Sequence, residues 1–145
     1  MNVSARVEYG LRAMLVLASA GQVNLTAQAL ADQQRLPLTF LHAILGELRR
    51  ARLVRSQRGT DGGYRLALPA DQISVGDVIR AMDGSWFRGR RRDSYPGVAE
   101  HLGQVWAAID AAVWRVVDGL TLADLAAGRL PSHVRELLGG PAWTR

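Results

Sequence analysis

The chain of 145 residues is 48% apolar, which is enough to form the core of one domain. It contains no cysteine, so disulfides, cysteine nucleophiles and thiolate metal sites are excluded. No apolar run approaches the ~20 residues that span a membrane, and the N-terminus carries Glu8 early and lacks a signal-peptide pattern. We therefore expect a cytoplasmic protein with no membrane contact.

The net charge of +5 belongs to the first 65 residues, which hold nine arginines and four acidic residues. The remaining residues carry nine of each and are neutral. Because a one-sided positive charge attracts polyanions, this asymmetry favours nucleic acid as the partner of the N-terminal half. The sequence shows no Ser-His-Asp set, phosphate-binding loop or paired carboxylates on one helix face, so we do not expect an enzyme.

The first part of the chain predicts two helices separated from a third by a short turn. Apolar residues recur every three or four positions over residues 4–18, which predicts a helix with Ser4 as its N-cap. Thr26 can cap a second helix over residues 27–34. Pro37 disfavours helical backbone at the residue before it, so the chain turns there. Helices joined in this way predict a helix-turn-helix.

The third helix begins near Pro37 and has two different faces. The apolar face must pack on a core, and it comprises Leu41, Ile44, Leu45 and Leu48. The opposite face is small and polar with a cation near its C-terminal end, and it comprises Thr39, His42, Gly46 and Arg49. Such a helix can lie in the major groove of DNA, which admits a helix and presents base edges.

A β-hairpin with a glycine-rich tip is predicted next, with strands over residues 53–57 and 64–68. Asp61-Gly62 is a turn dipeptide, because glycine accepts a positive φ without steric cost. Arg58, next to Gly59 on this thin tip, can enter a narrow minor groove, where the negative potential is enhanced. Helix and hairpin together predict a winged helix-turn-helix, a mainly α fold with a small β-hairpin wing. A helix–hairpin piece of another α+β domain is the alternative.

The second half begins with a helix over residues 75–82, preceded by the spacing of a capping box. Residues 86–100 hold four arginines among aromatic residues, and we interpret them as a solvated loop rather than a second nucleic-acid contact. A long periodic helix over residues 101–119 is interpreted as a dimer seam, with intramolecular core as the alternative. Thr121 caps another short helix, and a helical turn is predicted over residues 132–138.

These motifs resemble the winged-helix bacterial repressors typified by the iron–sulfur cluster regulator IscR, the nitric-oxide sensor NsrR and the cysteine regulator CymR. The resemblance covers residues 3–84 well, through the motifs at residues 8–13, 40–45 and 53–56. Its most specific motif is Arg58-Gly59 followed by Gly62-Gly63-Tyr64-Arg65-Leu66. Val105-Trp106 and residues 121–125 resemble the dimerisation helix and the short helix after it.

The resemblance implies a homodimeric transcriptional repressor that binds a palindromic operator in double-stranded DNA. A winged-helix protein-interaction module that does not bind DNA is the alternative. We expect a DNA-binding domain over residues 1–84, a loop at the family's sensor position over residues 85–100, and a dimerisation helix with its tail over residues 101–145. The expected DNA-binding residues are Leu38, Thr39, Phe40, His42, Arg49, Arg58, Gly59, Thr26 and Arg6. The expected dimer-interface residues are Leu102, Val105, Trp106, Ile109, Val113 and Val116.

His42 stands where the iron–sulfur cluster regulator has a glutamate. Glutamate accepts a hydrogen bond from cytosine N4, whereas histidine can donate one, so the resemblance implies a different operator preference. The reading of His42 as a solvated surface histidine is the alternative.

The sensor chemistry of the family does not carry over to this sequence. Many members hold an iron–sulfur cluster on cysteines in the loop corresponding to residues 86–100, and this chain has no cysteine, so no cofactor is expected. Some members add a glutamate and a histidine from the first helix, but here Glu8 is followed by Arg12, which predicts an ion pair. His101 and His133 lack partners at ligand spacing, so no metal site is expected. An unidentified small-molecule effector would bind near Trp86, Tyr95 and Trp106, although such aromatic residues more often belong to a core or lid.

Overall fold

The computed structural model describes residues 3–83 and 95–139, which are mainly helical with one two-stranded antiparallel sheet. In chain order the elements are α1 (Ala5–Ala20), α2 (Ala27–Gln34), α3 (Leu38–Arg50), β1 (Val54–Gln57), β2 (Gly63–Leu66), the 3₁₀ turn Ala70–Gln72, α4 (Val75–Met82), the 3₁₀ turn Gly97–Ala99, α5 (Leu102–Asp118), α6 (Leu122–Ala126) and α7 (Ser132–Leu138). This order confirms the winged helix-turn-helix that the sequence predicts. None of the helices in these two ranges has the length and apolar character of a membrane span.

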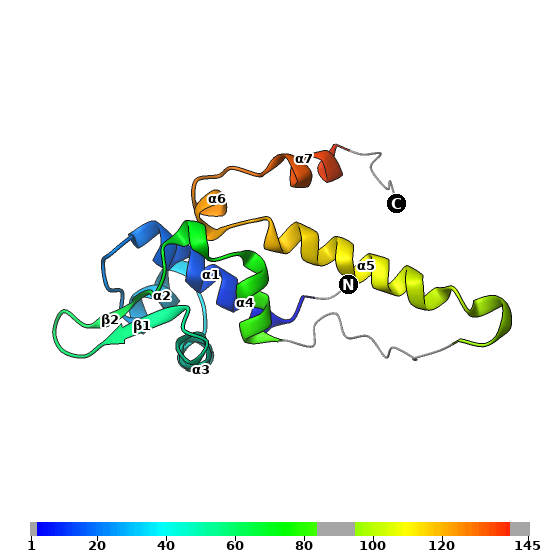
Figure 1. Cartoon of the computed structure of the whole chain (residues 1–145). Helices are drawn as coiled ribbons and strands as arrows, with labels where there is room; N and C mark the ends of the chain where they lie inside the picture. The colour runs from blue at the N-terminus through cyan, green and yellow to red at the C-terminus, as the bar shows by residue number, and fades with distance from the viewer. Residues whose placement is uncertain (1–2, 84–94, 140–145) are drawn as a thin grey trace.

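The core lies around α1, which packs against α2, α3, α4 and α6 (Figure 1). Val7, Met14 and Leu17 of α1 are fully buried there. The apolar stripe predicted for α3 is buried against them, as expected. Leu120 and Leu122, from the segment expected to serve dimerisation, complete the same core. We call residues 3–83 the N-terminal unit, and its core is therefore closed by residues that follow α5.

Side-chain caps explain why the helix starts match the sequence predictions. The Ser4 hydroxyl accepts a hydrogen bond from the Val7 amide at 3.3 Å, and Thr26 accepts one from the Ala29 amide at 3.1 Å. The capping box before α4 forms as predicted, because Ser74 and Asp77 exchange hydrogen bonds of 2.9 and 3.0 Å. Such caps satisfy amide groups that have no partner within the helix, so they determine where a helix begins.

In the wing, β1 starts one residue later than predicted, and β2 starts one residue earlier and ends two residues earlier than predicted. Its register runs from Val54 opposite Leu66 to Gln57 opposite Gly63, whereas the predicted strands covered residues 53–57 and 64–68. The second strand ends early because Pro69 has no amide to donate and turns the chain away. A single bridge extends the sheet, since Tyr64 exchanges backbone hydrogen bonds of 2.9 and 2.7 Å with Leu25 before α2.

The long helix α5 extends away from the N-terminal unit as an arm: it starts at the distant end and ends at that unit, and α7 lies beside this base (Figure 1). His133 Nε2 of α7 lies 3.4 Å from the carbonyl oxygen of Val116 in α5. The predicted apolar stripe therefore divides in two. Leu120, just after α5, is buried at 9% exposure, whereas the residues from Leu102 to Ile109 that belong to the stripe are 39–48% exposed.

Candidate nucleic-acid interface

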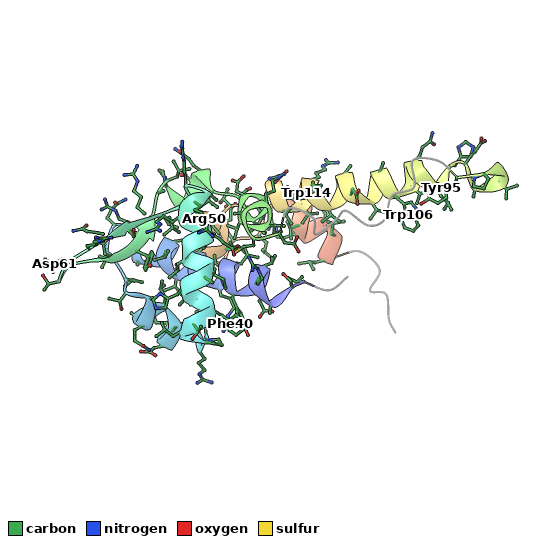
Figure 2. The ribbon with its side chains drawn as sticks, turned by 90° about the horizontal axis from the view of Figure 1, so that it is seen from below. Phe40, Arg50, Asp61, Tyr95, Trp106 and Trp114 are labelled. Atoms are coloured by element: carbon green, nitrogen blue, oxygen red, sulfur yellow. The ribbon has the colours of Figure 1, made fainter. Side chains whose placement is uncertain are left out.

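The solvent-facing side of α3 is a largely polar surface on the outside of the N-terminal unit. Figure 2 shows α3 crossing the front of this unit, with Phe40 and Arg50 at its two ends. Thr39, His42 and Arg49 are exposed on it, as the sequence predicts, and Gly46 is partly buried. Phe40 is 61% exposed, and an exposed aromatic ring on such a face suits contact with a thymine methyl group. We refer to this surface as the reader face.

The tip of the wing projects beyond the N-terminal unit and carries Arg58 and Gly59 in exposed positions. Gly59 has φ +104°, and its carbonyl oxygen accepts a hydrogen bond from the Gly62 amide at 3.0 Å. A Cβ atom at Gly62 would lie 2.4 Å from the carbonyl oxygen of Gln57. Glycines therefore allow a tip that is narrow enough to present the Arg58 guanidinium to a groove.

The turn before α2 holds the wing in position relative to α3. Asn24 Nδ2 donates to Gln57 Oε1 and to the carbonyl oxygen of Asp61, both at 3.0 Å. Gly63 adopts φ +138°, and a Cβ atom there would lie 2.5 Å from the carbonyl oxygen of Leu25. The close approach permits the Tyr64–Leu25 bridge, so the turn before α2 holds the wing along β2 and at its tip.

A groove between the C-terminal end of α3 and the wing brings Arg49 together with Arg52 and Arg55, which the sequence analysis did not single out. Its volume is about 570 Å³, and it is lined by Arg49, Arg52, Val54, Arg55, Ser56, Ala67 and Leu68. Arg49 Nη1 donates to Ser56 Oγ at 3.4 Å, which ties the reader face to β1. Arginine forks suit phosphate oxygens. The sequence alone gives no signal for this arginine-lined groove, because Arg49, Arg52 and Arg55 come to one side only where the turn at Arg52 brings β1 beside α3.

Besides Arg49, three of the expected DNA-binding residues have structural roles. Leu38 is partly buried against the core, and Thr26 caps α2 while remaining exposed. Arg6 makes an ion pair with Glu47, which joins α1 to α3. These residues take part in packing, capping or ion pairing of the helices, whereas Thr39, Phe40, His42 and Arg49 are exposed on the reader face.

The expected dimer-interface residues lie along one stripe of α5. Leu102, Val105, Trp106 and Ile109 are 39–48% exposed, and Val113 and Val116 are partly buried near the base. Of the expected effector pocket, Trp86 lies outside the described residues. Tyr95 is partly buried and Trp106 is 45% exposed.

The side chains of this protein do not provide the ligands of the iron–sulfur cluster that many members of the resembled family hold. The chain offers no thiolate, and Glu8 faces Arg12 at 3.6 Å in an ion pair, as the sequence predicts. Across residues 3–83 and 95–139, no three His, Cys, Asp or Glu side chains gather in a way that could hold a metal ion. The described residues therefore offer no site for a metal centre.

Comparisons with known proteins agree with this architecture. A protein named as a helix-turn-helix-type transcriptional regulator of Mycobacterium tuberculosis is 43% identical over 142 residues, which cover 94% of this chain and 88% of the relative. The regulator CymR of Bacillus subtilis is 35% identical over 128 residues, covering 87% of this chain and 90% of the relative.

Solved structures show the same arrangement of elements. IscR of T. potens superposes with a TM-score of 0.75 at 32% identity and covers 88% of both chains. CymR, described as the global cysteine regulator of B. subtilis, superposes with a TM-score of 0.74 at 32% identity, covering 88% of this chain and 98% of that one. The Rrf2 family model, described as an iron-dependent transcriptional regulator, matches residues 3–128. The chain is accordingly a member of the Rrf2 family of DNA-binding winged-helix transcriptional regulators, in a form without cysteine.

Proposed function

We propose that the protein is a homodimeric repressor that binds a palindromic operator without an iron–sulfur cluster. The observation that carries this proposal is the exposed reader face of α3, flanked by the anchored, arginine-bearing wing. In this arrangement α3 enters the major groove while Arg58 and Gly59 enter the adjacent minor groove. The arginine-lined groove then faces backbone phosphates, which position the protein without carrying sequence information.

The proposed dimer forms through the apolar stripe of α5. Four large apolar side chains at its far end remain 39–48% exposed in the single chain, and pairing with the same stripe of a second copy would cover them. A two-fold axis between the arms would place two reader faces about 34 Å apart, which is one turn of DNA. The two-fold symmetry of the protein would then require a palindromic operator.

Binding to DNA fragments at several salt concentrations tests this function. We expect the protein to shift a fragment from upstream of its own gene, with an affinity that falls by roughly three to five decades between 50 and 200 mM salt if 6–10 phosphates are contacted. Repression is tested by transcription from that fragment in vitro with and without the protein. Failure to bind any promoter fragment at low salt would contradict the proposal, and a salt-insensitive interaction with a protein would favour the protein-interaction alternative.

A further inference from the structure

The base of the α5 arm is joined to the N-terminal unit by a two-pronged ion pair. Arg80 of α4 donates from Nη1 and Nη2 to the two carboxylate oxygens of Asp118 at 2.8 and 2.6 Å. The same guanidinium lies 4.2 Å from the centre of the Trp114 ring, also in α5. Two parallel hydrogen bonds and a stacked ring fix a guanidinium in direction as well as in distance. The contact therefore restrains the angle between α4 and α5.

A glycine allows the two helices to approach at this point. Gly76 is buried, and a Cβ atom there would lie 1.9 Å from Asp118 Oδ1 and 3.0 Å from its Cγ. Any side chain at residue 76 would displace the carboxylate that Arg80 binds. Asp77, 3.7 Å from Arg80, adds a second negative charge, and the hydrogen bond to Asp118 raises the pKa of Arg80 above its ordinary value. We call Gly76, Arg80, Trp114 and Asp118 the arm clamp.

The chain on either side of the clamp is held by backbone hydrogen bonds. The Val75 amide donates to Leu120 at 2.8 Å, and the Leu122 amide donates to Ile73 at 2.9 Å. These bonds pin the end of α5 to the start of α4 at one place. Two backbone bonds at a single point fix the direction of a helix less than contacts within the helix do. The clamp holds α5 itself, at Asp118 and at Trp114, which lies one turn closer to the far end of the arm.

The far end of the arm has no comparable support from the N-terminal unit among the described residues. Trp114 and Val117 near the base pack on the core, whereas the stripe from Leu102 to Ile109 is 39–48% exposed. A helix of 17 residues is a rod about 26 Å long, at 1.5 Å per residue. A rotation of roughly 10° at its base would move its far end by about 4.5 Å, which exceeds the ~3.4 Å spacing of base pairs along DNA.

From this geometry we infer that the arm clamp sets the operator half-site spacing that the dimer accepts. The inference rests on the proposed function, because the arm determines spacing only if it forms the dimer seam. Arg80 and Asp118 are then positioning residues: they contact no DNA, yet they decide how far apart the two reader faces lie. Loss of the clamp would broaden the range of accepted spacings and leave recognition of each half-site unchanged.

The test uses the full chain and an operator selected from random duplex DNA by the wild-type protein. Its half-sites are then separated by every spacing across about one helical turn of DNA, in steps of one base pair. We expect wild type to lose about tenfold in affinity for each step away from its optimum, whereas Asp118→Asn and Arg80→Gln bind neighbouring spacings within about threefold. Unchanged spacing selectivity in both folded variants would overturn the inference.

Two further variants separate the clamp from a general loss of charge or stability. Glu8→Gln breaks the Glu8–Arg12 ion pair of α1, which is also half-exposed, and should leave spacing selectivity as in wild type. Arg80→Lys keeps the charge above Trp114 but not the fork, and should give an intermediate selectivity. Thermal unfolding by circular dichroism confirms that each variant is folded.

A measurement without DNA tests the clamp even if operator binding fails. Because the chain has no cysteine, Gln72→Cys and Gln104→Cys introduce two unique sites for spin labels, one on the N-terminal unit and one on the arm. Labelled protein is diluted with unlabelled protein, so that only distances within one chain are measured. We expect a narrow distance distribution in wild type and a broader or shifted one with Asp118→Asn. Identical distributions would refute the clamp, whereas a clamp effect without any DNA binding would refute the proposed function alone.

Discussion

At the scale of single residues, the proposed function assigns base reading to His42 and phosphate binding to Arg49. His42 is exposed one helical turn after Leu38, on the same face as Thr39 and away from the buried stripe. The imidazole there can donate to acceptor atoms of guanine or adenine in the major groove. Arg49, by contrast, is already directed toward β1 by its hydrogen bond to Ser56.

We predict that His42→Ala alters which operator is preferred more than it weakens binding to unrelated DNA. The reason is that a base contact discriminates between sequences by about 1–3 kcal/mol, whereas phosphate contacts do not. Selection of bound sequences from random DNA by wild type and variant measures the change. An equal loss of affinity for every sequence would show that His42 does not read a base.

Arg58 gives a second prediction at this scale. Arg58→Ala should weaken operator binding by about 1–3 kcal/mol and leave the free energy of unfolding unchanged, because the side chain is exposed and the tip is closed by backbone contacts. Arg135→Ala, which removes an exposed arginine from α7 at the other end of the chain, is the control for net charge. Equal effects of the two substitutions on affinity would argue against a specific role for the wing.

At the scale of elements, local signals in the sequence were sufficient for most of the fold. Caps and apolar periodicity gave α2, α4 and α7 with the bounds that the structure shows. Contacts between distant elements left no periodic trace, so the pairing of Arg6 with Glu47 and of Arg80 with Asp118 could not be predicted. The need for glycine at residue 76 depends on the pairing of Arg80 with Asp118, so it could not be predicted from the sequence either.

In the candidate site, too, features within one element could be predicted, whereas features between distant elements could not. The reader face follows from the 3.6-residue period of one helix, so it could be predicted from its buried side. The arginine-lined groove needs the turn at Arg52, which adopts φ +61°, to bring β1 beside α3. The bridge from Leu25 to Tyr64 joins segments almost forty residues apart and also required the structure.

The wing supplies a prediction about an element, since glycines at two positions in it play different roles. Gly63→Ala would bring a Cβ atom within 2.5 Å of the Leu25 carbonyl oxygen, whereas a Cβ atom at Gly59 would meet nothing within 4 Å. We expect Gly63→Ala to destabilise the protein by about 2–4 kcal/mol through overpacking and strain, and Gly59→Ala by about 1 kcal/mol through strain alone. Urea unfolding of both variants measures the difference. Equal stabilities would mean that the wing is not anchored on the turn before α2.

At the scale of the whole molecule, one core and one uncovered stripe share the same C-terminal segment. The residues after α5 close the N-terminal unit through Leu120 and Leu122, so the arm is an integral part of the fold rather than an appended tail. Its far end exposes the apolar face, and its opposite face carries Gln104 and Ala107. An exposed apolar stripe of this kind on a folded protein is typical of a subunit that forms an oligomer through that stripe.

We therefore predict that Ile109→Asp converts the protein to a monomer. Ile109 is 47% exposed in the single chain and lies at the centre of the stripe, so in the dimer the variant would bury an unpaired carboxylate at a cost of several kcal/mol. Ala107→Asp places the same charge on the opposite, exposed face of α5 and should leave the dimer intact. Sedimentation equilibrium measures the mass of both variants, and operator binding should fall in the first because the two half-sites are no longer bound together. A dimer that persists in Ile109→Asp would place the seam elsewhere and would remove the geometric link between the α5 arm and operator spacing.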